Sequence, residues 1–321
     1  MANDLIATDL ETQLEGHRRE LTAYCYRMLG SGFEAEDAVQ ETFIRAWKNI
    51  EGFEGRSSLR SWLYRIATNV CLDMVRGPQR RARPMEFGPS SPIETAAVGT
   101  AYSEKTWVQP IPNAKVLPTD GDPAELALAR ETIRLAFIAA LQNLPARQRA
   151  VLILREVLRW QATEVAELLD TTVASVNSAL QRARETMGDV NIDSTATSVG
   201  ADQQALLDRY VDAFERYDVA ELVTMLRDDV ILSMPPYALW LQGTENFAGW
   251  FLGEGIVCRG SRLVATAANG DVAFACYHPD GKGGFAPWAI QMIETDGERI
   301  TGHHNYLGSE LFGYFGLPAK L

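Results

Sequence analysis

The 321-residue sequence predicts a multidomain protein in which two all-α domains are followed by an α+β domain. Three observations favour this fold class. Residues 5–83 and 125–188 carry apolar side chains at helical spacing. Residues 84–124 hold seven of the fourteen prolines and little periodic pattern, which predicts an extended linker without regular structure. After a polar linker at 189–201, residues 202–321 change from helical spacing to short β-type runs.

The first helical domain includes a helix that we expect to start in GSGFEAED, where Glu34, Glu36 and Asp37 suit the positive end of the helix dipole. The residues expected to face inward are Ala35, Ala38, Val39, Phe43, Ala46, Trp47 and Ile50. The opposite face displays Asp37, Gln40, Glu41, Ile44 and Arg45. This could be an ordinary solvated face, but Ile44 among charges favours a docking surface.

A second helix is predicted over Ser57–Arg76, after the glycine-flanked loop EGFEGRS with Phe53 and Arg56 near its tip. Its predicted buried face consists of Leu59, Trp62, Leu63, Ile66, Ala67, Val70 and Met74. Its polar face consists of Arg65, Asn69, Asp73 and Arg76. Beyond the helix come Arg80, Arg81 and Arg83, a basic cluster that could hold phosphates, although a charge run is more often a solvated face.

The second helical domain is predicted to open with one amphipathic stretch and to end in a helix-turn-helix. The stretch aligns Leu126, Ile133, Phe137, Ala140 and Leu144, and Pro145 suits the first turn of the next helix. Around a turn at residues 170–172, the inward residues are Val165, Ala166, Leu168, Leu169, Val176, Leu180, Ala183 and Met187. The outer face offers Ser175, Asn177, Ser178, Gln181, Arg182 and Arg184, which can bond phosphates or base edges. A surface helix of a bundle would carry similar residues, so spacing alone leaves both interpretations open.

Charge and cysteine content narrow the functional class. The net charge is -12, but residues 189–321 carry 18 acidic and 8 basic side chains, so the helical domains are close to neutral. We therefore expect weak binding to free DNA. Cys25, Cys71, Cys258 and Cys276 lack C-x-x-C spacing and lie among apolar neighbours, which favours core residues over a disulfide or a metal site. No cofactor is indicated.

The chain contains no apolar run near the roughly 20 residues of a membrane span, and no signal segment opens it. We therefore expect a cytoplasmic protein.

The C-terminal domain is predicted to begin with two helices and continue as a sheet. One helix aligns Leu206, Leu207, Tyr210, Val211, Phe214 and Tyr217, and residues 220–226 form a second. The strand candidates are VILSMPP, YALWLQG, RLVATAANGDVAFACYH and FAPWAIQMIETDGERITGHHNYL. Hairpin signals at Asn269-Gly270, Asp280-Gly281 and Asp296-Gly297 separate the strands.

Four sequence motifs together resemble those of the extracytoplasmic-function (ECF) sigma factors, the small sigma-70 proteins that carry bacterial RNA polymerase to promoters. They are AEDAVQETFIRAW, FEGRSSLRSWLYRIATNVCLD, LPARQRAVLILRE and the helix-turn-helix, in the order and spacing of the family over roughly the first 190 residues. The resemblance implies core RNA polymerase and promoter DNA as partners and no catalytic residues. It also leaves room for an anti-sigma factor.

The resemblance assigns roles to the polar faces. The family docks the first helix on polymerase, which implies Asp37, Gln40, Glu41, Ile44 and Arg45. It captures a flipped base of the minus-10 element with the following loop and helix, which implies Phe53, Arg56, Ser57, Arg60, Arg65, Asn69, Asp73 and Arg76. The minus-35 candidates are Ser175, Asn177, Ser178, Gln181, Arg182 and Arg184. Asp170 replaces the usual turn glycine, and Asn177 and Ala179 stand where basic residues are frequent, which reduces phosphate anchoring.

In the family the linker threads through the polymerase cleft. Here TWVQPIPNAKVLP, with Trp107, Pro110 and Pro112, is too apolar for a free spacer, so part of it should dock on a folded surface. This Trp-x-x-Pro-x-Pro word resembles a narrower, sigma-G-type group that carries an appended domain.

The appended domain resembles the SnoaL-like branch of the nuclear-transport-factor-2-like (NTF2-like) fold, a curled sheet wrapped by helices around a pocket. Its aromatic residues are Trp240, Phe247, Trp250, Phe251, Trp288 and Phe312, which suit either a core or a small-ligand site. Relatives of the fold include cyclases and isomerases, and the conceivable pocket residues are His303, His304, Asp212 and Tyr237. We expect a regulatory role. The alternatives are a ligand-sensing helix-turn-helix transcription factor and a SnoaL-like enzyme fused to a DNA-binding module.

Overall fold

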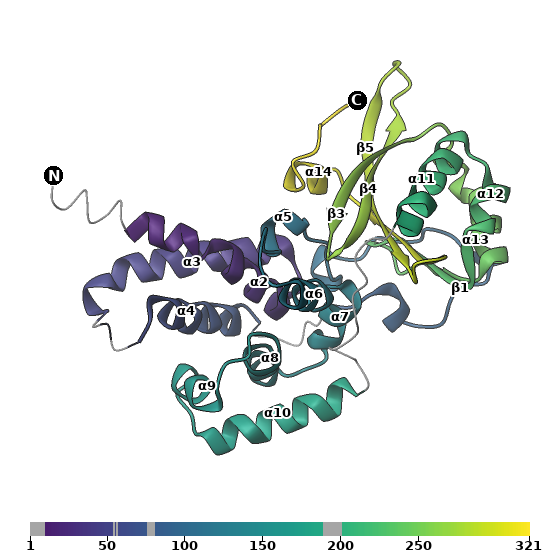
Figure 1. Ribbon diagram of the computed structural model, residues 1–321. Helices are drawn as coiled ribbons and strands as arrows, with labels where there is room; N and C mark the ends of the chain where they lie inside the picture. The colour runs from purple at the N-terminus through teal and green to yellow at the C-terminus, as the bar shows by residue number, and fades with distance from the viewer. Residues whose placement is uncertain (1–9, 54, 56, 76–80, 189–200) are drawn as a thin grey trace. The chain divides into compact units, whose positions relative to one another are not determined.

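The computed structural model describes residues 10–53, 55, 57–75, 81–188 and 201–321 (Figure 1). The chain forms two compact units. The helical unit comprises residues 1–81 and 113–194, and the sheet unit comprises residues 82–112 and 195–321. The predicted linker at 189–201 lies almost entirely outside the described residues. Two helical segments followed by a mixed α+β domain confirm the predicted fold class.

The first part of the helical unit is a bundle held by an aromatic core. Its elements are α2 (Arg18–Leu29), α3 (Gly32–Asn49), η1 (Ile50–Gly52) and α4 (Leu59–Met74). Gly30, with φ 71°, ends α2, and the Ser31 hydroxyl accepts from the Glu34 N–H to start α3 where the sequence predicted a helix start. The Tyr24 and Tyr64 rings meet edge to face at 5.1 Å in the core. Cys25 and Cys71 are buried there as predicted.

The second part of the helical unit ends in a helix-turn-helix. Its elements are α5 (Asn113–Val116), α6 (Pro123–Glu131), α7 (Leu135–Gln142), α8 (Ala146–Leu152), the π-helix η5 (Ile153–Val157), α9 (Ala162–Leu168) and α10 (Val173–Met187). Pro145 is the N-cap of α8, one residue before its first turn. The amphipathic stretch predicted as a single helix is instead two helices, α6 and α7, because the chain breaks at Thr132. The Thr132 hydroxyl donates back to the Leu128 carbonyl, and the Arg27 guanidinium takes the Thr132 carbonyl that a continued helix would use.

The sheet unit carries a six-stranded sheet with helices α11–α13 gathered on one side (Figure 1). The strand order is β2-β1-β6-β5-β4-β3, with β1 and β6 parallel and the other neighbours antiparallel. The helices are α11 (Ala201–Arg216), α12 (Val219–Thr224), α13 (Thr244–Leu252), η6 (Glu254–Cys258) and α14 (Glu310–Tyr314). The strands are β1 (Leu226–Ser233), β2 (Trp240–Gln242), β3 (Arg262–Ala268), β4 (Asp271–Pro279), β5 (Phe285–Thr295) and β6 (Ile300–Leu307).

The three predicted hairpin turns join β3 to β4, β4 to β5 and β5 to β6. Asn269 and Gly270 have φ of 52° and 82°, the left-handed values that a tight hairpin turn needs. The predicted strand YALWLQG is reduced to the three residues of β2, because the chain enters α13 directly afterwards. Trp250, Phe251 and Phe312 are buried, so part of the predicted aromatic surface is core.

Residues 84–124 are not the extended linker that the sequence predicted. They contain three short 3-10 turns, η2 (Pro84–Glu86), η3 (Ile93–Thr95) and η4 (Glu104–Thr106), and then α5 and the start of α6. Residues 82–112 pack within the sheet unit, since Trp107, Val108 and Ile111 are buried there. Burial of these apolar side chains offsets the entropy of ordering a proline-rich segment.

Candidate nucleic-acid interface

The helix-turn-helix of α9 and α10 is fixed by caps and by a small apolar core. Thr172 caps α10 by accepting from the Ser175 N–H at 3.1 Å. Asp170 has φ 49°, so it occupies the left-handed turn position where the family usually has glycine. The eight predicted inward residues are all buried, which confirms the side-chain pattern of both helices.

The outer face of α10 exposes all six predicted minus-35 candidates. The Arg182 guanidinium donates to the Ser178 hydroxyl at 2.7 Å, and the Gln181 amide donates to Glu185 at 3.0 Å. Arg184 is instead turned to Glu156, with which it forms an ion pair at 2.6 Å. Ser175 shares a hydrogen bond with the Thr172 hydroxyl at 2.9 Å, so Asn177 is the candidate of these six whose side chain makes no hydrogen bond within the described residues.

The polar stripe of α4 faces the first helix of the helix-turn-helix. Arg65, Asn69 and Asp73 are exposed along α4. The Arg65 guanidinium donates to the carbonyl oxygens of Leu168, at 3.4 Å, and Glu167, which end α9. These carbonyls form the negative end of the α9 dipole, so a cation is stabilised there. Arg65 therefore contacts α9 and not the outer face of α10, beside a hollow that Ser57 and Arg65 line with residues of α9.

The base-capture residues are less free than the sequence suggested. Phe53 is partly buried and lies on the Trp62 ring, with ring centroids 4.9 Å apart. Arg60 pairs with Glu20 at 2.7 Å and lies over the Tyr64 and Trp160 rings, at 5.0 and 5.5 Å. Ser57 is exposed, whereas Arg56 and Arg76 lie outside the described residues.

Two predictions around α4 are wrong. Met74 is 41% exposed instead of buried, and it is the last residue of α4. Arg81 is buried and pairs with Glu34 at 2.7 Å, so it does not offer its charge to phosphates. Arg83 is half-buried in the sheet unit, and Arg80 lies outside the described residues.

The predicted polymerase face of α3 is exposed at Asp37, Gln40 and Ile44. Glu41 and Arg45 are half-buried and pair at 2.6 Å, and Arg45 also reaches Asp73 of α4 at 3.6 Å.

Trp47, predicted to face inward, is 45% exposed and lies three residues after Ile44, which is 40% exposed. The i, i+3 spacing puts Trp47 on the same face as Ile44. The spacing from Ile44 could have identified Trp47 as a surface residue, but its hydrophobic side chain led us to expect it on the buried face.

The conceivable catalytic residues of the sheet unit do not converge. His303 is fully buried, and its Nε2 lies 2.8 Å from the Tyr210 hydroxyl. Neighbouring His304 points to the other face of β6, where its Nδ1 lies 2.8 Å from the Ser233 hydroxyl. Asp212 is exposed and pairs with Arg216, and Tyr237 is half-buried.

The space around His303 is occupied by aromatic side chains. Rings of Phe214, Phe247 and Phe251 lie 5.5 to 6.4 Å from the imidazole centroid. Burial lowers the pKa of His303 to about 3, so the ring is neutral at physiological pH. This arrangement is a packed polar core and does not expose an acid or a base to a substrate.

Across residues 10–53, 55, 57–75, 81–188 and 201–321, no three or more His, Cys, Asp or Glu side chains gather as a metal site would require. Cys276 is buried, and Cys258 packs half-buried against the core. In the same part of the chain, no helix has the length and apolar character needed to cross a bilayer.

Both helical parts of the chain match known protein families. Residues 14–81 match the family model of Sigma-70 region 2, and residues 134–187 match that of Sigma-70, region 4. The "ECF RNA polymerase sigma factor SigG" of Mycobacterium tuberculosis (strain CDC 1551 / Oshkosh) is 41% identical over 324 residues, covering 98% of this chain and 85% of that protein. The "ECF RNA polymerase sigma factor SigW" of Bacillus subtilis (strain 168) is 32% identical over 171 residues, covering 53% of this chain and 82% of that protein.

A solved structure extends the likeness in fold to both units. The crystal structure of the Mycobacterium tuberculosis extracytoplasmic function sigma factor SigJ aligns with a TM-score of 0.60 at 20% identity, covering 96% of this chain and 99% of that one. Since two sigma-70 segments occur in order and a relative is 41% identical along nearly the whole length, this chain belongs to the extracytoplasmic-function sigma factors of the sigma-70 family.

Proposed function

We propose that this ECF sigma factor divides promoter recognition among three exposed helix faces. The face of α3 with Ile44 and Trp47 docks on core RNA polymerase in the cytoplasm. The polar stripe of α4, with Asn69 and Asp73, contacts the minus-10 element. The outer face of α10, with Asn177 and Arg182, reads the minus-35 element. The observation that carries this assignment is the helix-turn-helix, whose predicted base-reading residues are all exposed on one helix.

The charge distribution supports action within a holoenzyme. Residues 125–188, which hold the helix-turn-helix, carry 8 basic and 7 acidic side chains. A protein that binds duplex DNA alone draws most of its affinity from phosphate contacts by lysine and arginine. Here the polymerase supplies that affinity, and α10 supplies only the choice of sequence.

The free chain is held in a state that cannot engage both promoter elements. Arg65 of α4 is bonded to the carbonyl end of α9, so the helix-turn-helix holds this one arginine of the stripe. The minus-10 and minus-35 elements lie apart on a promoter, and the two helical parts must separate to reach both. Polymerase binding would drive this separation by offering each part its own surface.

The sheet unit regulates this opening by holding the linker. The Trp107 indole N–H donates to the Pro236 carbonyl at 2.9 Å, and the Tyr102 N–H donates to the same oxygen at 2.9 Å. The Trp240 indole N–H donates to the Gly88 carbonyl at 3.0 Å. A linker bound in this way is withdrawn from the polymerase cleft, so its release is coupled to activity. This role requires no catalysis by the sheet unit.

Binding of the purified chain to core polymerase and to DNA tests the function. We expect the full chain to co-purify with core polymerase and to give no sequence-specific gel shift alone. A specific shift without polymerase would support the ligand-sensing transcription factor instead. We expect Asn69→Ala to leave polymerase binding intact while impairing promoter melting. Unchanged open-complex formation by that variant would contradict the role assigned to α4.

A further inference from the structure

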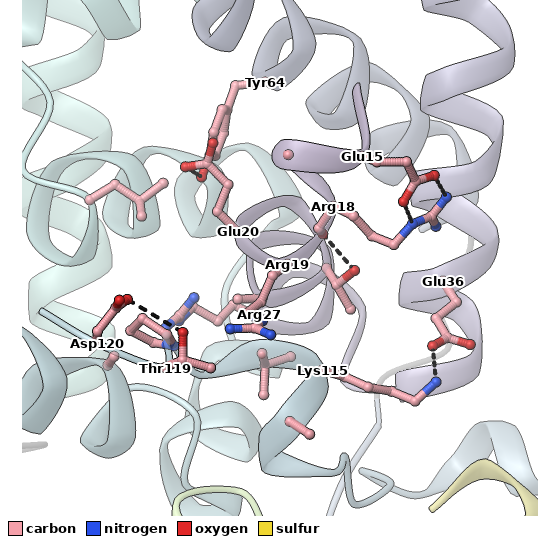
Figure 2. A pocket seen from close by; sticks show the side chains of 18 residues that line it. Glu15, Arg18, Arg19, Glu20, Arg27, Glu36, Tyr64, Lys115, Thr119 and Asp120 are labelled. Atoms are coloured by element: carbon pink, nitrogen blue, oxygen red, sulfur yellow. Dashed lines mark hydrogen bonds and ion pairs between the residues drawn. The ribbon is translucent and has the colours of Figure 1, made fainter. Parts of the chain in front are cut away.

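A cavity of about 720 Å3 lies in the helical unit beside α2 (Figure 2). Its walls come from α2, from residues 114–120, from Ala129 of α6 and from Leu158. Both helical parts of the unit therefore contribute to it. Nothing in the sigma-factor role described above uses this cavity.

Most of the charged wall residues form ion pairs, two of them within the wall and one with Arg60 outside it. The ion pairs are Glu15 with Arg18 at 2.5 Å, Glu20 with Arg60 at 2.7 Å, and Glu36 with Lys115. Among the described residues, Arg19 and Arg27 have no carboxylate partner, and Asp120 is the wall carboxylate without a cation. Figure 2 shows Arg19, Arg27 and Asp120 around the same opening. The wall therefore carries four acidic and four basic side chains, and two of its arginines and one aspartate lack an ion-pair partner among the described residues.

Arg27 is the buried one of these two arginines. Its side chain is only 4% exposed, and its Nε and Nη2 donate to the Thr132 carbonyl and hydroxyl, at 3.1 and 2.8 Å. The third nitrogen, Nη1, has no partner among the described residues and keeps accessible surface at the cavity. Burial lowers the pKa of Arg27 to about 10, so the guanidinium is still charged at neutral pH.

A second buried arginine in the same unit bonds with both of its amino groups instead of one. Arg149 is also 4% exposed, and its two Nη groups donate to carbonyl oxygens that include those of Met28 and Gln142. Those carbonyls end helices, so the charge of Arg149 is balanced by helix dipoles. Arg27 has one such carbonyl, at Thr132, and directs its remaining amino group into open space. A buried cation left partly unpaired is unfavourable unless an anion joins it.

We propose that this cavity binds a small phosphate ester, with the phosphate group on Arg27 and Arg19. The flat guanidinium edge matches phosphate oxygens, and two arginines suit a doubly charged anion. The volume exceeds what inorganic phosphate fills and suits a nucleotide-sized molecule. Ala23, Val116 and Ala129 supply apolar wall, and Asp120 can accept from a hydroxyl or amino group of the ligand.

Such a ligand would stabilise the closed helical unit. It contacts α2 on one side and residues 114–120 on the other, so it binds only while these segments are packed together. A ligand that binds one state shifts the equilibrium toward that state. The site would therefore link the level of a phosphorylated metabolite to the release of the promoter-reading helices.

Titration calorimetry of the full-length chain tests the site. The probes are adenosine 5′-monophosphate, inorganic phosphate and, as the uncharged control, adenosine. We expect saturable one-to-one binding of the monophosphate, weaker binding of phosphate and none of adenosine. Binding of inorganic phosphate without binding of the monophosphate would show that the cavity binds an anion, but it would contradict a phosphate ester as the ligand. Saturable binding of neither anion would overturn the proposal.

Substitutions inside and outside the cavity wall test whether the monophosphate binds in this cavity. Arg27→Gln can still donate to Thr132 but lacks the charge, and Arg19→Gln removes an exposed charge that holds no described contact. We expect each to weaken monophosphate binding about 10-fold or more, the effect of losing one charge-assisted hydrogen bond. Arg147→Gln, at an exposed arginine outside the cavity wall, should leave binding unchanged. If Arg27→Gln fails to fold, Arg19→Gln decides alone, and unaltered binding by Arg19→Gln would then contradict the proposal.

Discussion

At the scale of single residues, His303 shows how a histidine can sit in an apolar core without acting as a base. The Asn305 amide N–H donates to Nδ1 at 3.0 Å, so Nε2 carries the hydrogen and donates to the Tyr210 hydroxyl. That hydroxyl in turn donates to the Gln291 side-chain oxygen at 2.9 Å. These hydrogen bonds link Asn305, His303, Tyr210 and Gln291 in one network, which makes the network a stabilising part of the core.

This network predicts a pH dependence of stability. Burial lowers the pKa of His303 to about 3, below the ordinary value of 6.5. The unfolded chain therefore takes up a proton first, so stability that is present above pH 6.5 is lost as the pH falls toward 3. We expect the buried, neutral His303 to lower the free energy of unfolding by about 2 kcal/mol between pH 7 and pH 5. Urea unfolding followed by the tryptophan fluorescence of the sheet unit measures this change.

His278 contributes in the same direction, because burial lowers its pKa to about 4. The control is therefore His303→Gln, which we expect to be less stable at pH 7 but to show a shallower loss between pH 7 and pH 5. Equal slopes for the variant and the parent chain would contradict the buried, neutral His303.

Trp47 is the second residue whose place has a functional consequence. It lies exposed beside Ile44 on α3, and exposed tryptophans are frequent centres of binding energy at protein interfaces. We expect Trp47→Ala to weaken binding to core polymerase at least about 10-fold, close to 1.4 kcal/mol, by fluorescence anisotropy. Leu252→Ala, at a side chain 66% exposed in the sheet unit, is the control and should bind normally. Equal affinities would remove α3 from the docking surface.

At the scale of elements, a close contact between Gly249 of α13 and Ile93 of η3 helps to position the linker. A Cβ built on Gly249 of α13 would lie 2.7 Å from the Ile93 side chain of η3, nearer than such atoms approach in proteins. Gly249 is therefore required for Ile93 to pack on the core of the sheet unit. Alanine there would suit the helix but displace the linker.

Gly249→Ala should consequently release the linker around η3. We expect faster amide exchange at residues 91–96 and altered transcription by the reconstituted holoenzyme, measured by hydrogen–deuterium exchange and run-off assays. Gly313→Ala, where an added Cβ meets nothing within 4 Å, is the matched control. Unchanged exchange in Gly249→Ala would show that the linker does not depend on this contact.

Sequence patterns predicted correctly those elements that depend only on residues close together in the chain. The hairpin turn at Asn269-Gly270 follows from residues that tolerate left-handed backbone, and the buried face of α10 follows from helical spacing. The break between α6 and α7 could not be predicted, because it depends on Arg27, which lies 105 residues from Thr132. The apolar linker indicated that docking occurs, but not that α13 and Pro236 form the docking surface.

At the scale of the whole molecule, one residue of the proposed promoter-binding surface is held by a contact between two helices of the helical unit. Arg65 lies on the stripe assigned to the minus-10 element, yet in the free chain it bonds to the end of α9. The sequence identified this residue as a site candidate but could not reveal its partner, since pairing of α4 with α9 is a tertiary feature. We propose that this contact limits DNA binding by the free chain until polymerase separates α4 from α9.

Sequencing the 5′ ends of RNA made from a fragmented genomic library, by core polymerase with and without the full-length chain, tests the central claim most directly. We predict start sites that appear only with the chain and share two sequence elements at a fixed separation, upstream of the start. Start sites identical to those of core polymerase alone would contradict the account.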